Sequence, residues 1–390
     1  MRSPLANAYT ESVAGWLAIV GIGLVWLIVI GCTGAEDAAR PTIGAAGQSP
    51  VVIQNETPIA VGKNDLAALA ATAAAQTLAA AGKPQTTPAP AALKPQAVQI
   101  GIVRPVWEPI RLQEQALAAQ VRQVNTGDPE EYVRAIDQLI RGGANVVITI
   151  GTDLVQATQD AAERNPQVRF IGIDQYQERV MPNVVGLVFD DDQAGFLAGA
   201  LAALMTKTSF VGAIVGPGWM SNMVAYGEGF ALGAEYVNPS VVSLVEYHPG
   251  ELPEGFADQR WGRDTANQMI ADGADIIFAA GGATGQAAID AARARSVLAI
   301  GAEVDQYDAL PNARGVLLTS LYKVITTDSI KALVKGISEG TIKGGNVSGE
   351  TRVAPYREAE PKIPAQVRDR VSTIERGLKQ GSIKTGLQLH

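Results

Sequence analysis

Acidic residues and glycines follow several predicted strands of this chain, in a pattern that can bind a small polar molecule. Each candidate lies within a few residues of the end of an apolar run: Asp174, Gly281, Gly282, Glu303 and Asp305. Glycine lets backbone amides approach a ligand, and carboxylates accept hydrogen bonds from ligand hydroxyl groups. Because open parallel sheets bind ligands outside the carboxyl ends of their strands, we expect a small polar ligand at this edge.

Tryptophan at two of these strand ends adds a possible stacking surface. Aromatic residues make up only 5% of the chain, so each exposed ring is informative. Trp219 follows a Gly-Pro-Gly turn, and Trp107 follows the first apolar run. Stacking on a nucleobase contributes about 1–3 kcal/mol, whereas packing between lobes is the alternative role for Trp219.

The elements that position these residues alternate along the chain from residue 98. The predicted strands span residues 98–103, 145–150, 169–173, 211–215, 241–247, 275–279, 297–300 and 316–318. The predicted helices span residues 130–141, 154–164, 194–204, 228–237, 265–272 and 286–295. Continuous apolar strands indicate a parallel sheet covered on both faces. Their number exceeds one domain, so the sequence predicts an α/β protein with two doubly wound, three-layer lobes.

The N-terminal segment indicates export. The run 13–30 carries no charge, Arg2 precedes it, and the chain's one cysteine, Cys32, follows it. Val29-Ile30-Gly31-Cys32 resembles the bacterial lipobox, which implies a signal peptide over 1–32, lipidation of Cys32 and a position on the outer face of the cell membrane. An uncleaved transmembrane anchor is the alternative, because about 18 apolar residues also span a bilayer. Residues 33–96 are rich in Ala, Pro, Gln and Thr and are predicted to form a tether.

Composition argues against several function classes. The net charge of −8 argues against nucleic acid as a partner, and two histidines with one cysteine argue against a transition-metal site. The acidic run 190–192 lacks the spacing of a calcium loop and is predicted to be a solvated strand end. Ser320 and Lys323 fit a Ser-x-x-Lys nucleophile motif, but its partner motifs Ser-Asp-Asn and Lys-Thr-Gly do not occur. We therefore expect no enzymatic activity, metal or cofactor.

Several motifs in order resemble a known family. Residues 189–208, FDDDQAGFLAGALAALMTKT, resemble the stretch F-x-x-x-x-G-[SA]-F-L-A-G-x-x-A-x-x-x-T-K-T of the basic membrane protein family. Further matches span residues 226–239, 273–285, 300–306 and 319–323. Members of this family are substrate-binding lipoproteins of ABC importers, and the best understood are purine nucleoside receptors. The resemblance covers roughly residues 98–345.

The resemblance implies a type I periplasmic-binding fold, in which two lobes joined by three hinge crossings close on a ligand. The expected first lobe spans about 97–188 plus 302–345, and the expected second lobe spans 189–301. Residues 346–390 are expected to form a C-terminal extension.

The resemblance also implies ligand contacts. Glu303 and Asp305 match acidic positions of the family motif, of which one holds the ribose hydroxyls, and Lys323 matches its Thr-Ser-x-x-Lys lysine. Residues 104–109 lack the family's Ser-Phe-Asn, and Trp107 could replace that missing ring. The expected function is to bind a purine nucleoside between the lobes and to dock on an ABC permease with its ATPase. A sensor that presents its closed form to a membrane signalling receptor is the alternative.

Overall fold

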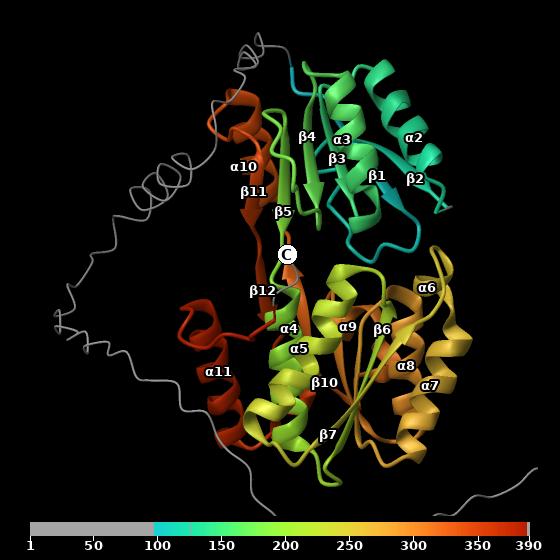
Figure 1. Cartoon of the computed structure of the whole chain (residues 1–390), viewed down its shortest axis with the longest axis vertical. Coiled ribbons are helices and arrows are strands. Elements are labelled where there is room, and N and C mark those ends of the chain that lie inside the picture. The colour runs from blue at the N-terminus through green and yellow to red at the C-terminus, as the bar shows by residue number, and fades with distance from the viewer. Residues whose placement is uncertain (1–96, 126, 388–390) are drawn as a thin grey trace, which may run out of the picture. The chain divides into compact units, whose positions relative to one another are not determined.

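The computed structural model describes residues 97–125 and 127–387. The expected signal peptide, Cys32 and the tether lie outside these described residues. Two six-stranded sheets organise the described part, and each is covered by helices on both faces (Figure 1). The prediction of two doubly wound α/β lobes is confirmed.

The first sheet is parallel throughout. In spatial order its strands are β11 (Gly345–Ser348), β5 (Val184–Val188), β4 (Arg169–Ile173), β3 (Val146–Ile150), β1 (Ile100–Pro105) and β2 (Gln120–Val124). One face packs on α2 (Pro129–Arg141) and α3 (Val155–Arg164), and the other packs on α10 (Thr327–Glu339). Strands β3 and β4 are buried along their whole length, because helices cover both of their faces.

The second sheet has the same architecture with one antiparallel edge. In spatial order its strands are β12 (Glu350–Val353), β10 (Leu317–Val324), β9 (Leu298–Glu303), β8 (Ile276–Ala279), β6 (Phe210–Pro217) and β7 (Val242–His248). Helices α4 (Asp191–Met205), α5 (Ser221–Val237) and α11 (Ala365–Lys379) cover one face, and α7 (Gln259–Ala271) and α8 (Gly282–Ala294) cover the other. Short helices α6 (Glu254–Ala257) and α9 (Gln306–Ala309) complete this lobe.

Glycines let α4 and α5 pack closely in the second lobe. A Cβ atom added to Gly199 would lie 1.9 Å from the carbonyl oxygen of Phe230, and one added to Gly233 would lie 1.9 Å from that of Phe196. Only the absence of a side chain permits this approach of backbone to backbone. The two helices therefore form a fixed pair, and their first turns carry Asp191 and Asn222.

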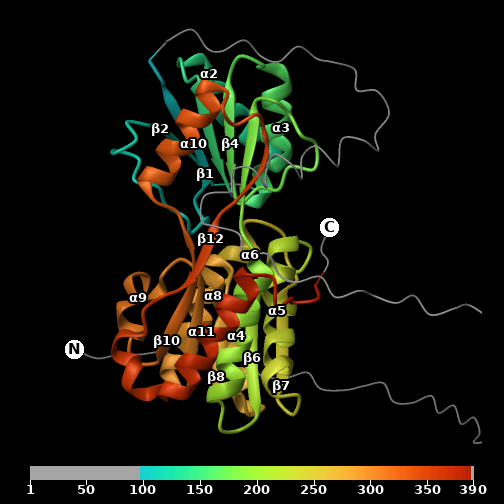
Figure 2. The same cartoon turned by 90° about the vertical axis from the view of Figure 1, so that its left-hand side faces the viewer.

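The chain passes between the two sheets three times within the described residues. It leaves the first sheet after β5, returns after β10, and crosses again between β11 and β12, as Figure 2 shows for the last of these. The expectation that the chain re-enters the first lobe near residue 302 is wrong. Strand β10 pairs with β9, which keeps residues 317–324 in the second sheet. The first lobe instead resumes with α10, which begins at Thr327.

The segment 346–390, expected as an extension, belongs to both lobes over its described residues. Strand β11 extends the first sheet beside β5, and β12 pairs with β10 in the second. Helix α11 buries Val371, Ile374 and Leu378 in the core formed with α4 and α5. Among residues 97–125 and 127–387, no helix combines the length and apolar character that crossing a membrane requires.

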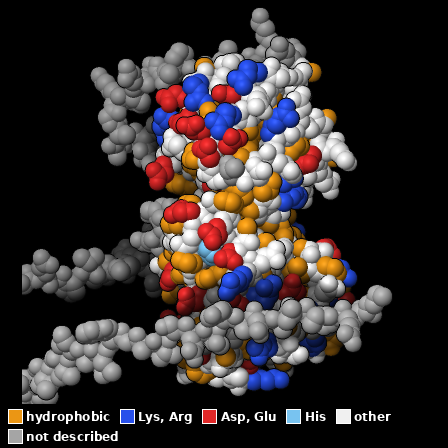
Figure 3. Space-filling view, turned by 90° about the vertical axis from the view of Figure 1, so that its right-hand side faces the viewer, with side chains coloured by type: hydrophobic (Ala, Val, Ile, Leu, Met, Phe, Trp, Pro, Cys, Tyr) orange, Lys and Arg blue, Asp and Glu red, His pale blue; other side chains and the backbone are white. Residues whose placement is uncertain are grey.

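The ion pairs that Arg134 makes on helix α2 of the first lobe are exposed. Arg134 contacts Glu130 at 3.2 Å and Glu131 at 2.5 Å, all on α2. Figure 3 shows acidic and basic side chains intermixed over this end of the molecule. Exposed pairs contribute about 0–1 kcal/mol each, so this surface contributes little to stability.

Candidate functional site

A buried lysine lies between the two lobes. Lys323, near the end of β10, has a side chain that is 1% exposed. Its Nζ donates to Asp174 Oδ2 at 2.6 Å and to Asp191 Oδ2 at 3.2 Å. Burial lowers the pKa of Lys323, but the two carboxylates outweigh burial and raise the pKa above its usual value. Lys323 is therefore a charged ammonium that joins the first lobe, through Asp174, to the second.

Asp174 is the first lobe's partner in this contact. It follows β4 with φ of 62°, a left-handed conformation that Asp and Asn adopt more readily than most residues. Thr152 Oγ1 donates to its carbonyl oxygen at 3.0 Å. Its Oδ2 also accepts from Asn222 Nδ2 of α5 at 3.5 Å. Asp174 therefore lies between the lobes, and its contact with a ligand stays a prediction.

Asp191 was not among the expected site residues. The acidic run 190–192 was expected to be solvated, which is wrong for Asp191, because its side chain is 5% exposed at the first turn of α4. Its Oδ1 lies 3.2 Å from Lys323 Nζ, yet this buried atom accepts no hydrogen bond. Burial raises the pKa of Asp191, against the lowering influence of the Lys323 ammonium.

Glu303 lies at the end of β9 and is also buried. Its Oε2 accepts from the backbone amides of Gly281 at 3.0 Å and Gly282 at 3.3 Å, which begin α8. Burial raises the pKa of Glu303, while Lys323 and these two amides lower it. The structure thus brings together three predicted site residues, Glu303, Gly281 and Gly282. These hydrogen bonds join the residues to one another.

The segment after β1 reaches the second lobe. Trp107 packs against the cores of both lobes, and its carbonyl oxygen lies beside Gly282. Glu108, which sequence reasoning missed, is 8% exposed, and its Oε1 accepts from the Ile110 amide at 2.9 Å. Burial, and then the Glu303 carboxylate, raise the pKa of Glu108 to about 8.

Two predicted site residues lie apart from this cluster. Asp305 caps α9 by accepting from the Tyr307 amide at 3.2 Å, and it pairs with Arg357 at 2.7 Å. Trp219, which follows β6, is 53% exposed. Neither residue lines the cavity beside Lys323.

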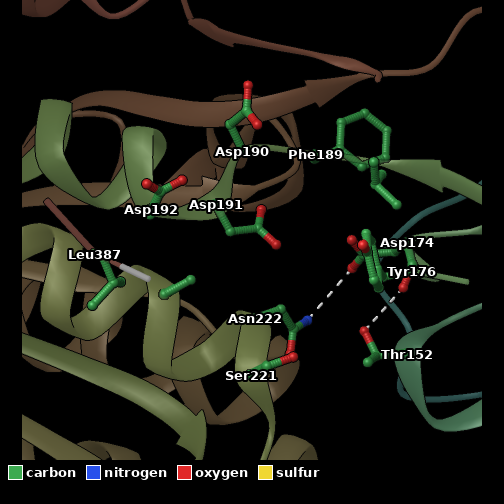
Figure 4. Close-up of a pocket in the computed structure, with 12 residues that line it drawn as sticks. Thr152, Asp174, Tyr176, Phe189, Asp190, Asp191, Asp192, Ser221, Asn222 and Leu387 are labelled. Atoms are coloured by element: carbon green, nitrogen blue, oxygen red, sulfur yellow. Dashed lines mark hydrogen bonds between the residues drawn. The ribbon is translucent and has the colours of Figure 1, made fainter. Parts of the chain in front are cut away.

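A cavity of about 270 Å³ opens beside the Lys323 contacts. Both lobes and the first crossing line it, and its lining residues are Thr152, Asp174, Tyr176, Val188, Phe189, Asp190, Asp191, Asp192, Ser221, Asn222, Ala225 and Leu387. In Figure 4 the Asp191 carboxylate points into the space that it shares with Asp174 and Asn222. Ligand pockets typically measure about 300–1,000 Å³, so this cavity suits a small molecule.

The cavity offers carboxylates, a carboxamide and hydroxyl groups to a ligand, with Tyr176 and Phe189 as aromatic walls. Within residues 97–125 and 127–387, no group of three or more His, Cys, Asp or Glu side chains is placed to hold a metal ion. The carboxylates, carboxamide and hydroxyl groups of the cavity are suited to reversible binding through hydrogen bonds and charge.

Comparison with known proteins places the chain in a family. The model of the Bmp family, described as ABC transporter substrate-binding protein PnrA-like, matches residues 107–348, which is more than half of the chain. The chain belongs to this family. The resemblance inferred from residues 189–208 and the later motifs is thereby confirmed, and the Bmp match contains the cavity except for Leu387.

Curated relatives of this Bmp chain include Basic membrane protein D of Borreliella burgdorferi (strain JD1). That protein is 32% identical over 234 residues, which are 58% of this chain and 64% of the relative. The CD4+ T-cell-stimulating antigen of Listeria monocytogenes serovar 1/2a is 26% identical over 277 residues, which are 65% of this chain and 73% of the relative. The matches to basic membrane proteins A1, B and D span 58–66% of those relatives' own length.

Solved structures share the fold. A solute-binding protein of an ABC transporter system from Aeropyrum pernix K1 superposes with a TM-score of 0.62 at 18% identity, over 74% of this chain and 92% of that one. A transcriptional activator of the comK gene from Bacillus halodurans superposes with a TM-score of 0.58 at 20% identity, over 73% of this chain and 99% of that one. At such identities the likeness shows the fold alone, which is the expected type I periplasmic-binding fold with two lobes.

Proposed function

We propose that this Bmp-family chain is the extracytoplasmic substrate-binding component of an ABC importer, and that it holds a small polar ligand between its two lobes. The observation that carries the proposal is the cavity beside Lys323, because both lobes contribute polar side chains to it. The family match supports the importer assignment. Genes for a permease and an ATPase beside this one would be expected.

The proposed mechanism needs no covalent step. A ligand in the cavity contacts Thr152 and Asp174 of the first lobe and Ser221 and Asn222 of the second. Such a ligand binds more tightly when the lobes are closed, because contacts with both lobes are then made. The difference in affinity between the closed and the open arrangement is what stabilises the closed one. The liganded form is then the one that docks on the permease.

The finer proposal, implied by the resemblance, is that the ligand is a purine nucleoside. Carboxylates and amides around the cavity can accept and donate hydrogen bonds to ribose hydroxyls and to a base. Tyr176 and Phe189 supply aromatic surface for stacking there, whereas Trp107 was the expected replacement for the family's ring. The Glu303 carboxylate could exchange its bonds to Gly281 and Gly282 for ligand hydroxyls.

The lipid anchor is a separate part of the proposal. Cys32, outside the described residues, is the residue that would carry the lipid, and residues 33–96 would tether the lobes to the membrane. In bacteria fed a fatty-acid analogue, the wild-type chain should be labelled and Cys32→Ser should not. Equal labelling of both chains would contradict lipidation at this cysteine.

Thermal unfolding of the purified full-length chain tests the ligand assignment. Adenosine, guanosine, inosine, cytidine, free bases and ribose would each be added in excess. A ligand at about a hundred times its dissociation constant stabilises the chain by about 2.7 kcal/mol. We expect stabilisation by purine nucleosides that is lost in Asp174→Asn. No stabilisation by any of these compounds would discard the nucleoside assignment.

A further inference from the structure

A segment near the C-terminus contributes one wall of the cavity between the lobes. Leu387 lines that cavity, whereas every other lining residue of the described part lies between residues 152 and 225. In Figure 4 Leu387 lies on the side of α4 and α5, across the labelled aspartates from Tyr176 and Phe189. The C-terminal strap, residues 382–387, thus reaches the proposed ligand site.

The strap is attached to α11 at its first residues. The Ile383 amide donates to the carbonyl oxygen of Gly377 at 3.0 Å, and the Ser382 hydroxyl donates to the same oxygen at 3.2 Å. The Ile383 side chain packs against the core that α11 forms with α4 and α5. The strap is therefore anchored in the second lobe.

A hydroxyl group holds the other end of the strap on α4. Thr385 Oγ1 donates to Asp192 Oδ2 at 2.5 Å and accepts from the Leu387 amide at 3.4 Å. Asp192 lies in the first turn of α4 and lines the cavity itself. A hydrogen bond to a carboxylate is stronger than one between neutral groups, so Thr385 holds the Leu387 backbone beside the cavity.

Leu387 gives an apolar wall to a small cavity. Its side chain lies among polar lining residues such as Ser221 and Asn222, and the residue is half-buried. With Leu387 in place the cavity measures about 270 Å³, at the small end of the range for ligand pockets. Because closely packed atoms tolerate little added volume, one side chain in such a wall can decide which ligands fit.

We propose that Leu387 is a specificity-determining residue of this site, and that the strap holds its side chain against the bound ligand and limits the size of that ligand. The inference rests on the proposed function and adds a residue to its binding site. The strap lies beyond residue 348, where the Bmp match ends, so the family match does not cover it. A ligand with a bulky substituent would have to displace the strap and break the bond from Thr385 to Asp192, which weakens its binding.

Two nucleosides that differ in size test the inference. Calorimetric titration of the full-length chain would compare adenosine with benzyladenosine, which carries a benzyl group on its exocyclic nitrogen. Leu387→Ala removes apolar contact surface, so adenosine should bind about threefold to tenfold more weakly. The bulkier nucleoside gains space, so the ratio of the two dissociation constants should shift toward it by about tenfold. Thr385→Val keeps the shape of the side chain but frees the strap, and should shift the ratio in the same direction by about threefold.

Matched controls change similar side chains away from the cavity. Thr373→Val removes a hydroxyl from α11, where it donates to the carbonyl oxygen of Asp369. Val180→Ala shortens an apolar residue that is 68% exposed in the first lobe. Neither Thr373 nor Val180 lines the cavity, so both variants should keep the wild-type ratio. If adenosine binds and the ratio is unchanged in both strap variants, the inference is overturned and the substrate-binding function stands.

A measurement without ligand decides the inference if neither nucleoside binds. Ala225 lines the cavity and is 4% exposed, so Ala225→Cys in a full-length Cys32→Ser chain places a single thiol there. Its reaction with dithiodipyridine, a neutral aromatic disulfide, would be followed by absorbance. The rate should rise by at least about fivefold when Leu387→Ala or Thr385→Val is added, because the strap no longer covers the thiol. Equal rates would overturn the inference, whereas failure of every purine nucleoside to bind would overturn the proposed ligand and leave the strap to this measurement.

Discussion

The two lobes carry their polar groups on different supports, although their sheets have the same architecture. In the first lobe, Glu108 and Asp174 lie on loops that follow β1 and β4. In the second, Lys323 lies within β10, and Asp191 and Asn222 lie in the first turns of α4 and α5. The second lobe is thus a fixed platform, whereas the first contributes groups whose positions depend on loop conformation. Ligand specificity should therefore be easier to alter in the first lobe, and stability easier to lose in the second.

The largest expected effect is the loss of the ammonium between the lobes. Lys323→Met leaves Asp174 and Asp191 buried without their cation, which should cost about 3–5 kcal/mol of unfolding free energy. Denaturant unfolding of the full-length chain measures this cost, with exposed Lys331→Met as the matched control. A loss below about 1 kcal/mol would contradict the assignment of Lys323 as the central contact.

Glu108 should make the stability depend on pH. Its pKa is raised from 4.5 to about 8, so the folded chain retains a proton that the unfolded chain releases. The contribution of this group to the unfolding free energy is full below about pH 4.5 and falls as the pH rises toward 8, by on the order of 5 kcal/mol. Burial is the main cause of the raised pKa of Glu108. The Glu303 and Asp174 carboxylates raise this pKa further, whereas the Ile110 amide and the Lys323 ammonium lower it.

Glu108→Gln removes this titration while keeping an acceptor for the Ile110 amide. Unfolding free energies measured from pH 5 to 8 should fall less steeply in the variant than in the wild-type chain. Parallel pH profiles would show that Glu108 is ionised in the folded state and would contradict its burial beside Glu303.

The close contact of α4 and α5 gives the next effect. Gly233→Ala places a methyl group against the carbonyl of Phe196 and should cost about 1–3 kcal/mol or more. Gly315→Ala is the matched control, because nothing lies within 4 Å of its added Cβ. Equal unfolding free energies for these two variants would show that the second lobe is not the rigid platform described above.

Burial explains how much of this fold could be predicted from the sequence. Strands β3 and β4 are apolar throughout because both faces are covered, and their predicted bounds were nearly correct. Strand β2 escaped prediction, because it is a largely exposed edge strand of polar residues. The sequence predicted too early a point, near residue 302, for the chain to re-enter the first lobe. The pairing of β10 with β9 joins separate segments and is not visible in local sequence.

The candidate site was predictable only where local pattern sufficed. Asp174, Glu303 and the glycines of α8 follow strand ends, so their common edge could be inferred. Asp191 could not, because an acidic run is ordinarily solvated and its burial depends on Lys323, 132 residues away. Glu108 was missed for the same reason, since its neighbours Glu303 and Asp174 belong to distant segments.

Asp305 provides a smaller test of the site's extent. Asp305→Ala removes the cap of α9 and the pair with Arg357, at a cost of about 1 kcal/mol in unfolding free energy. Ligand affinity should not change, because Asp305 does not line the cavity. A large loss of affinity at unchanged folding would extend the site to this residue, as the family motif implies.

The smallest expected effect is at Trp219. Trp219→Ala should change the unfolding free energy by less than about 0.5 kcal/mol, because this residue is 53% exposed. The affinity for any ligand that stabilises the chain should change by less than about threefold. A loss of tenfold or more would restore the stacking role that the sequence suggested.

The most direct test of the central claim is calorimetric titration of the full-length wild-type chain and Asp174→Asn. The ligand would be the compound that stabilises the wild-type chain most among the nucleosides, free bases and ribose. Asparagine keeps the size and left-handed backbone of Asp174 but removes the charge that reaches across to Lys323. The account predicts saturable binding to the wild-type chain, weakened at least about tenfold in the variant. Equal affinity in both chains would contradict a binding site between the lobes at Asp174.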